Sequence, residues 1–163
     1  MKIGICFGCY CPLHQGHLDV IMRSKKECDL TFVVVCGYDN EERTDSCGLP
    51  LDKRYRIINN FLEDELVKVI KVNDTELGID ESYSDNNWKI WINAIYDQIR
   101  NILWDYDKPI YFNWYVSEPS YAKALEKNCD IPGVPKFVKL MDRNENKISG
   151  TMCRTEPLKN WSK

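Results

Sequence analysis

One apolar run, LTFVVVCGY at residues 30–38, constrains the fold of this chain more than any other segment. It is rich in β-branched residues and nearly continuous in apolar character, which is typical of a strand buried on both faces of a parallel sheet. Short apolar runs and helical patterns alternate along the rest of the chain. This alternation predicts an α/β fold with a parallel sheet.

The predicted elements fill the chain without an internal repeat. Further strands are expected at 2–7, 67–72, 109–116 and 136–142, helices at 17–26, 52–62, 86–103 and 117–128, and a short capped helix at 148–157. Asp52 and Ser117 are the expected helix caps, and Pro119 lies in a first turn. Residues 39–50 are predicted to be a polar loop. We expect a single domain over residues 1–163.

Composition excludes several classes of protein. The net charge is −3 and the 22 basic residues are scattered among 25 acidic ones, so we expect no nucleic-acid partner. The sequence lacks a signal peptide and any apolar run of bilayer length, which predicts a cytoplasmic protein without membrane contact. The chain has eight cysteines, but 44% of its residues are hydrophobic. Such a chain can bury a large core, whereas disulfide scaffolds are short chains with little core, so we do not expect a disulfide scaffold. Cys6 and Cys36 are expected to be small buried hydrophobes.

The segment GCYCPLHQGH, residues 8–17, follows the first strand and opens the first helix. Main-chain N–H groups and the positive end of a helix dipole collect there, which favours an anion. Gly8 and Gly16 allow a ligand to approach the backbone, and Pro12 stiffens the loop. His14 and His17 are spaced to donate to the same phosphate oxygens. The segment therefore predicts phosphoryl or nucleotidyl chemistry.

Other interpretations of this loop are weaker. It has neither the lysine of the G-x-x-x-x-G-K-[ST] phosphate loop nor a G-x-G-x-x-G pattern. Cys9, Cys11, His14 and His17 match a C-x-C-x-x-H-x-x-H zinc set, but their compact spacing over a proline loop disfavours a metal. A nucleophilic thiol at Cys9 or Cys11 lacks any other signature of acyl transfer. Isolated histidines usually cap helices or lie on the surface, whereas these are the only two in the chain.

Two motifs at opposite ends of the chain resemble those of the nucleotidylyltransferase superfamily. The pattern G-x-[FY]-x-P-x-H-x-G-H is matched by Gly8, Tyr10, Pro12, His14, Gly16 and His17, and I-S-[GST]-T-x-x-R by Ile148, Ser149, Gly150, Thr151 and Arg154. The chain is most similar to nicotinamide-mononucleotide adenylyltransferases, above all to that domain of bifunctional bacterial NAD-biosynthesis regulators. Segments 12–21, 37–40, 52–57, 86–95, 116–122 and 148–157 and Trp161 carry the likeness.

The resemblance implies a Rossmann-like, doubly wound, five-stranded parallel sheet and a reaction. The 5′-phosphate of nicotinamide mononucleotide would attack the α-phosphorus of ATP and form NAD and pyrophosphate. His14, His17 and Arg154 are the implied catalytic residues. The implied ATP-binding residues are Gly8, Cys9, Tyr10, His14, Gly16, His17, Ser117, Glu118, Ser149, Gly150, Thr151 and Arg154. Nothing in the chain resembles the DNA-binding or ribosyl-kinase modules of the family, so those activities are not expected.

The acceptor would meet a different set of side chains. Tyr10 would contact it, Arg54 would pair with its phosphate, and Trp91 and Trp88 would stack on its pyridine ring. Plainer roles stand beside these, because tryptophan on an apolar helix face is usually core and an arginine on a helix is usually solvated. Mg²⁺ would bridge the phosphates with few or no protein ligands.

Two alternatives stay open at this point. The first alternative is a nucleotidylyltransferase that acts on another acceptor, such as nicotinate mononucleotide, pantetheine phosphate or a polyol phosphate. The second is a nucleotide-binding module without catalysis. The expected partners are ATP and a mononucleotide, and a homo-oligomer is compatible with the family resemblance.

Overall fold

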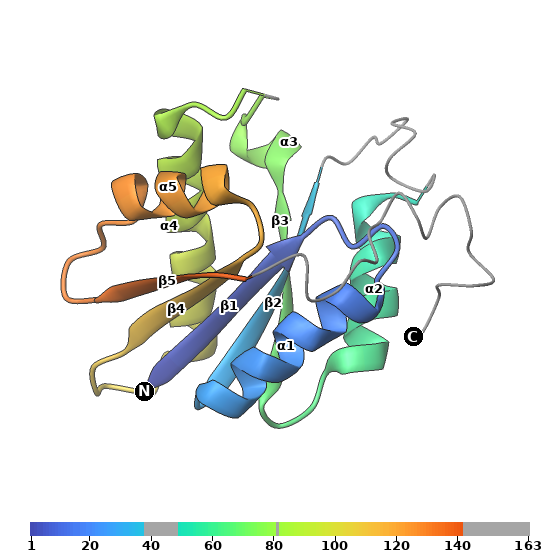
Figure 1. Ribbon diagram of the computed structural model, residues 1–163, viewed down its shortest axis with the longest axis horizontal. Coiled ribbons are helices and arrows are strands. Elements are labelled where there is room, and N and C mark those ends of the chain that lie inside the picture. Colours follow the sequence, from blue (N-terminus) through green and yellow to red (C-terminus); the bar gives the residue numbers. More distant parts are fainter. Residues whose placement is uncertain (38–48, 81, 142–163) are drawn as a thin grey trace.

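A five-stranded parallel sheet forms the centre of the computed structural model, which describes residues 1–37, 49–80 and 82–141 (Figure 1). Its strands are β1 (Lys2–Gly8), β2 (Leu30–Gly37), β3 (Val67–Asn73), β4 (Tyr111–Val116) and β5 (Lys136–Leu140). They lie in the order β3-β2-β1-β4-β5, and each neighbouring pair is parallel. The predicted α/β class and strand number are confirmed.

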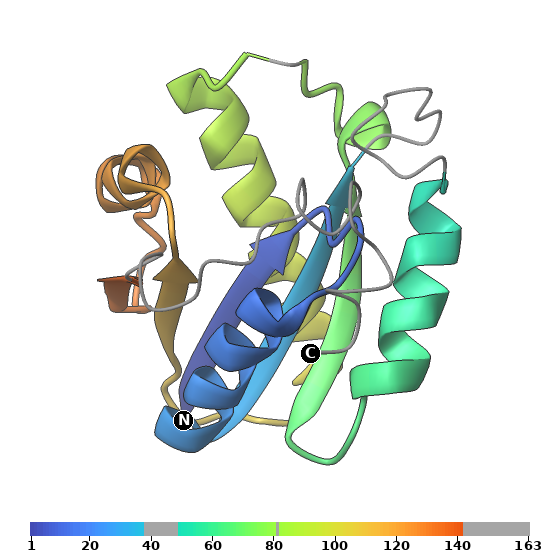
Figure 2. The same ribbon diagram turned by 45° about the vertical axis from the view of Figure 1, so that its right-hand side comes forward.

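Helices cover both faces of this sheet, as a doubly wound fold requires. The helices α1 (Gln15–Glu27) and α2 (Leu51–Leu62) lie on one face, and α4 (Asp85–Ile102) and α5 (Pro119–Asn128) lie on the other (Figure 2). The short α3 (Asp74–Leu77) follows β3 directly. In the part of the chain that the structure describes, no helix has the length and apolar character needed to cross a membrane.

Strand β2 shows why its sequence does not alternate. Phe32 and Val34 belong to the core beneath α4 and α5, whereas Val33 and Val35 belong to the core beneath α1 and α2. All four side chains have 0% exposure. Because both faces are buried, successive positions of the strand are apolar and the sequence does not alternate.

Helix α1 lies unusually close to β1. A Cβ atom on Gly4 would lie 1.8 Å from Oγ of Ser24, so only glycine fits there. Oγ of Ser24 is 2.8 Å from Oγ1 of Thr31 in a buried hydrogen bond, which satisfies both hydroxyls. This contact fixes α1 against β1 and β2, and with it the loop that joins β1 to α1.

Both predicted helix caps are wrong by one or two positions. Pro50 caps α2, and Asp52 lies in the first turn, where its carboxylate pairs with Lys71 at 2.5 Å. Glu118 caps α5, because Pro119 takes the first helical position that proline suits. Ser117 therefore precedes the cap.

Two further differences concern the helices, and one predicted helix is not described. Helix α1 starts at Gln15, two residues earlier than predicted, because His14 caps it. Helix α3 lies between the strand predicted at 67–72 and the helix predicted at 86–103, where no element is predicted, and the side chain of Asn73 accepts the N–H of Glu76 at 3.2 Å. The helix predicted at 148–157 lies outside the described residues.

Candidate functional site

The predicted site residues of the first motif lie where the strand order reverses. The chain leaves β1 through α1 on one face of the sheet and enters β4 after α4 on the opposite face. Strands β1 and β4 are neighbours, with Cys6 opposite Tyr115, so their carboxyl ends emerge side by side. Open α/β sheets bind ligands at such a reversal. The loop after Gly8 and the segment Ser117–Glu118 both begin there.

His14 and His17 form a reciprocal pair at the start of α1. His14 is the helix cap, and the two residues make a capping box in which each side chain faces the main-chain N–H of the other. Nδ1 of His17 accepts the N–H of His14 at 3.2 Å. The rings stack with centroids 3.7 Å apart and an interplanar angle of 19°. Since Nδ1 of His17 accepts, the ring proton is on Nε2, which makes Nε2 a donor.

Tyr10 supports this pair from the loop. Its φ of 51° lies in the left-handed region, and the loop continues through a cis peptide bond between Cys11 and Pro12. The ring is 5% exposed and meets His17 edge to face, with centroids 4.8 Å apart at 77°. Burial raises the pKa of the Tyr10 hydroxyl well above its ordinary value. The phenol therefore stays protonated, and the ring serves as a wall against His17.

Gly8 ends β1 without a conformational need for glycine. Among the described glycines, Gly37, Gly78 and Gly133 have a positive φ, and Gly8 does not. A Cβ atom on Gly8 would meet the Tyr10 ring at 3.7 Å, which is ordinary van der Waals contact. The fold would accept a side chain at this position, so its absence leaves the backbone open to a ligand. Gly16 follows as the second residue of α1.

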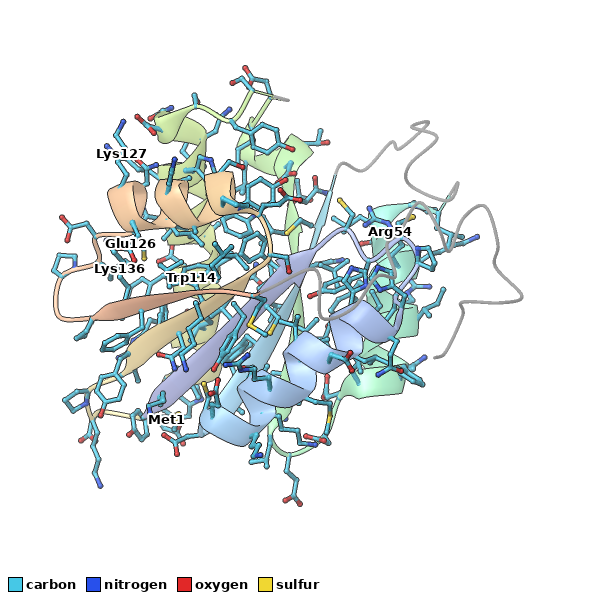
Figure 3. All side chains as sticks on the ribbon, in the orientation of Figure 1. Met1, Arg54, Trp114, Glu126, Lys127 and Lys136 are labelled. Atoms are coloured by element: carbon cyan, nitrogen blue, oxygen red, sulfur yellow. The ribbon has the colours of Figure 1, made fainter. Side chains whose placement is uncertain are left out.

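Arg54 lies at the N-terminal end of α2, beside the loop that leaves β1 (Figure 3). The side chain is 2% exposed. Its Nη1 donates to the carbonyl oxygens of Cys9 at 2.6 Å and Cys36 at 3.1 Å, and its Nε donates to the carbonyl of Leu49 at 3.2 Å. A solvated helix charge is thus excluded for Arg54. Its predicted contact with an acceptor phosphate stays a prediction.

The two predicted stacking residues belong to an aromatic cluster on α4. Trp88 and Trp91 are each 8% exposed, and their ring centroids lie 5.5 Å apart with an interplanar angle of 87°. The ring centroid of Phe7, next to the end of β1, is 4.8 Å from that of Trp91. The ring centroid of Tyr121 on α5 is 5.6 Å from that of Trp88. The cluster reaches the carboxyl end of β1, as an acceptor site requires. Stacking of a pyridine ring on either indole would need these aromatic neighbours to move.

The cysteines of the loop differ in exposure. Cys9 is exposed and Cys11 is buried, while Cys6 within β1 is buried and its thiol pKa is raised to about 12 by that burial. Within residues 1–37, 49–80 and 82–141, no three histidine, cysteine, aspartate or glutamate side chains converge as metal ligands would. Cys9, Cys11, His14 and His17, whose spacing disfavours a zinc set, are all among these residues.

The remaining predicted residues divide in two. Ser117 and Glu118 lie at the end of β4 beside the loop, as predicted. Ser149, Gly150, Thr151 and Arg154 lie outside the described residues, so their roles stay predictions. The sequence missed the part played by Phe7 and Tyr121, because no local pattern shows that residues of β1 and α5 meet the tryptophans of α4.

Known proteins resemble the chain over most of its length. A family model described as cytidylyltransferase-like matches residues 5–156. The trifunctional NAD biosynthesis/regulator protein NadR of Salmonella typhimurium is 26% identical over 98% of this chain, which covers only 38% of that protein. The chain thus spans well under half of this relative's length.

Solved structures resemble it in the same way. Crystal structures of NadR with NR, and of NadR with NAD and AMP-PNP, superpose with TM-scores of 0.78 at 33% identity over 97% of this chain, which covers 42% and 43% of theirs. A bifunctional NMN adenylyltransferase/ADP ribose pyrophosphatase of Francisella tularensis, crystallised with AMP and a manganese ion, has a TM-score of 0.61 over 95% of this chain and 41% of its own. At 12% identity it shares the fold alone.

Proposed function

The chain belongs to the cytidylyltransferase-like family, and from this premise we propose that it transfers the adenylyl group of ATP to nicotinamide mononucleotide. The products are NAD and pyrophosphate. The NadR relatives support this choice of donor and acceptor, since their name places them in NAD biosynthesis and their structures hold NR, or NAD with AMP-PNP. The proposal concerns this chain's own reaction and no other activity of those longer proteins.

The observation that carries the proposal is the stacked pair of His14 and His17 at the reversal of strand order. In the reaction, an oxygen of the acceptor phosphate forms a bond to the α-phosphorus of ATP. The bond from that phosphorus to the oxygen bridging to the β-phosphorus breaks, and pyrophosphate leaves with the electron pair. The attacking oxygen is already anionic, so no general base and no covalent intermediate is needed.

The protein's task is then to place two polyanions and to stabilise charge in the transition state. Nε2–H of His17 donates to an α-phosphate oxygen in this mechanism, His14 is proposed as the second residue that holds the α-phosphate oxygens, and the N-terminus of α1 adds positive potential around them. Ser117 and Glu118, which follow β4 beside the end of β1, are proposed for the adenosine. Ser149, Gly150, Thr151 and Arg154 are proposed for the β- and γ-phosphates.

The donor set of the loop also fits the proposed use of Mg²⁺. The loop offers imidazole and main-chain N–H groups, which suit phosphate oxygens, whereas Mg²⁺ prefers oxygen ligands. A magnesium ion would therefore bind the phosphates of ATP, with few or no protein ligands. When bound, it neutralises phosphate charge during the transfer.

The acceptor ring is proposed to lie beside Tyr10 and the aromatic cluster of α4. Trp91 is the candidate for stacking and Trp88 its support, with a shift of the Phe7 or Tyr121 ring on binding. Arg54 is predicted to pair with the acceptor phosphate, but its burial favours an indirect role.

A panel of acceptors tests the proposal. The protein is incubated with ATP and Mg²⁺ and, in turn, nicotinamide mononucleotide, nicotinate mononucleotide or pantetheine phosphate, and with CTP and a polyol phosphate. Pyrophosphate and the dinucleotide product are both measured. We expect NAD to form fastest. Turnover of another acceptor without NAD formation would overturn the choice of acceptor.

Replacing His17 with alanine separates an enzyme from a binding module. We expect pyrophosphate release to fall by about 100-fold or more, as loss of one transition-state donor does, with AMP-PNP still bound. Lys26→Ala is the matched control, because Lys26 is exposed near the far end of the same helix. Unchanged pyrophosphate release in H17A would show that the chemistry lies elsewhere.

A further inference from the structure

A buried cation joins three main-chain segments beneath the candidate site. The guanidinium of Arg54 holds the carbonyls of Cys9 after β1, of Cys36 near the end of β2 and of Leu49 before α2. Burying a guanidinium costs free energy unless hydrogen bonds compensate it. Here two of the bonds go to the carboxyl ends of the neighbouring strands β1 and β2, and the third goes to the segment that enters α2. The position of the loop therefore depends on Arg54.

The Cys9 carbonyl is the contact closest to the chemistry. It belongs to the peptide group that precedes Tyr10, whose φ of 51° is rare for residues other than glycine. Two features oppose a return to an ordinary backbone conformation. The Tyr10 ring is buried, and Nη1 of Arg54 fixes the preceding carbonyl at 2.6 Å.

Tyr10 in turn touches the proposed catalytic ring. Its ring meets the His17 ring edge to face at 4.8 Å, on a histidine already held through Nδ1 by the N–H of His14. Each contact removes one freedom of the imidazole. The hydrogen bond fixes the tautomer, and the Tyr10 ring limits rotation of the imidazole.

We infer that Arg54 is a positioning residue for the nucleotidyl transfer: through the Cys9 carbonyl it holds Tyr10 against His17 and so places Nε2 of His17 at the α-phosphate. This inference rests on the proposed function and gives Arg54 a role without direct contact with substrate. A direct phosphate contact is the competing role. The two roles predict different kinetics, because positioning of a catalytic group acts on kcat and uniform binding of a substrate acts on KM.

Arg54→Lys tests the inference with charge conserved. One ammonium cannot reproduce donation from both Nη1 and Nε of a planar guanidinium. We expect kcat to fall by about 10- to 100-fold, the effect of a small misplacement of a catalytic group, with the KM for the acceptor and the affinity for AMP-PNP changed less than about threefold. Arg56→Lys is the matched control, since Arg56 is exposed on the same helix. It is expected to leave kcat unchanged.

A spectroscopic readout tests the same contacts without turnover. The chain has two histidines, so imidazole proton and nitrogen NMR signals are few and can be assigned with H14Q and H17Q. In the folded wild type, we expect the ring current of Tyr10 to shift the ring-proton signals of His17, because the two rings are in edge-to-face contact. Arg54→Lys should move these signals toward those of an unconstrained imidazole, whereas Arg56→Lys should not.

The outcomes are distinct. An acceptor KM raised tenfold or more with kcat and the His17 signals unchanged would establish direct phosphate contact and overturn the inference. If Arg54→Lys does not fold, Tyr10→Leu carries the test, because it keeps Arg54 and removes the ring from His17. Tyr10→Leu must then both lower kcat and move the NMR signals of the His17 ring. If one of these two effects is missing, the inference is overturned. If no acceptor is turned over, the proposed function fails, whereas the NMR comparison still shows whether Arg54 controls His17.

Discussion

At the scale of single residues, His17 uses its two ring nitrogens for different tasks. Nδ1 accepts the main-chain N–H of His14, and Nε2 is the donor proposed for the α-phosphate. Glutamine places its amide near the position of Nε2, and asparagine places its amide near Nδ1. The two substitutions therefore separate catalysis from local structure.

We predict that His17→Gln keeps more activity than His17→Asn. Asparagine preserves the start of α1 and loses the phosphate donor, which lowers kcat by about 100- to 1000-fold. Glutamine keeps a donor near the right place, so its kcat falls by about tenfold. Pyrophosphate release at saturating ATP and acceptor gives the comparison, and circular dichroism checks that both variants fold. Equal loss in the two variants would refute the division of tasks between the nitrogens.

Two glycines of β1 differ in what requires them. A Cβ on Gly4 would overlap Ser24, whereas a Cβ on Gly8 would make ordinary contact with Tyr10. We predict that Gly4→Ala lowers the free energy of unfolding by about 1–3 kcal/mol through overpacking. Gly8→Ala should change stability by less than about 0.5 kcal/mol and weaken ATP binding, because the new methyl group occupies the backbone approach. Urea denaturation and AMP-PNP titration measure both. A destabilised Gly8→Ala with normal affinity would contradict the role given to Gly8.

At the scale of helices and strands, periodicity predicted the elements better than their ends. All five strands were predicted because each contains a short apolar run, which β1 to β4 bury in the sheet, whereas the edge strand β5 has no buried side chain. The helix caps were not predicted correctly. Asp52 and Ser117 are typical cap residues, but Pro50 and Pro119 set where α2 and α5 begin. A local sequence shows which residues can cap a helix, and the incoming chain direction decides which one does.

The site shows the same division. That Gly8, His14 and His17 lie near one another was predictable, because they are close in sequence and flank one helix start. The contacts of Arg54 were not, since Cys9 and Cys36 accept through main-chain carbonyls, which every residue has. Only the sheet order brings those carbonyls to one guanidinium.

Glu27 links three elements away from the site. Its Oε1 accepts the Tyr115 hydroxyl of β4 at 2.9 Å and Nζ of Lys139 of β5 at 3.2 Å. The Tyr115 hydrogen bond, with help from Lys139, lowers the pKa of Glu27 in the fold. A lowered folded-state pKa contributes stability above the unfolded pKa of about 4.3, and that stability is lost as pH falls through the folded pKa.

Glu27→Gln should therefore destabilise the protein at neutral pH and not in acid. The loss is at most about 1 kcal/mol near pH 7, because the carboxylate is partly solvated, and it shrinks below about pH 4. Urea unfolding across this range measures the difference from wild type. Glu126→Gln, an exposed carboxylate on α5, is the control and should show no such trend. A difference that grows in acid would contradict the assigned cause.

At the scale of the whole molecule, one sheet connects two cores and the candidate site. The core beneath α1 and α2 and the core beneath α4 and α5 share β1 and β2, whose side chains alternate between them. His14 and His17 lie at the start of α1 on the first face, and the tryptophan cluster lies on α4 on the second face. A ligand that touches both would bind the two layers together.

We therefore predict one cooperative thermal transition that shifts as a unit when nucleotide binds. AMP-PNP at about 100 times its Kd stabilises the folded state by about 2.7 kcal/mol, which raises the Tm of a domain of this size by about 5–10 °C. CTP is the control, since it carries a triphosphate on a base other than adenine and should give a smaller shift. Calorimetry measures both, and agreement of the calorimetric and van't Hoff enthalpies tests the single transition. Two separate transitions would refute the single domain, and a larger shift with CTP would favour cytidylyl transfer over the proposed reaction.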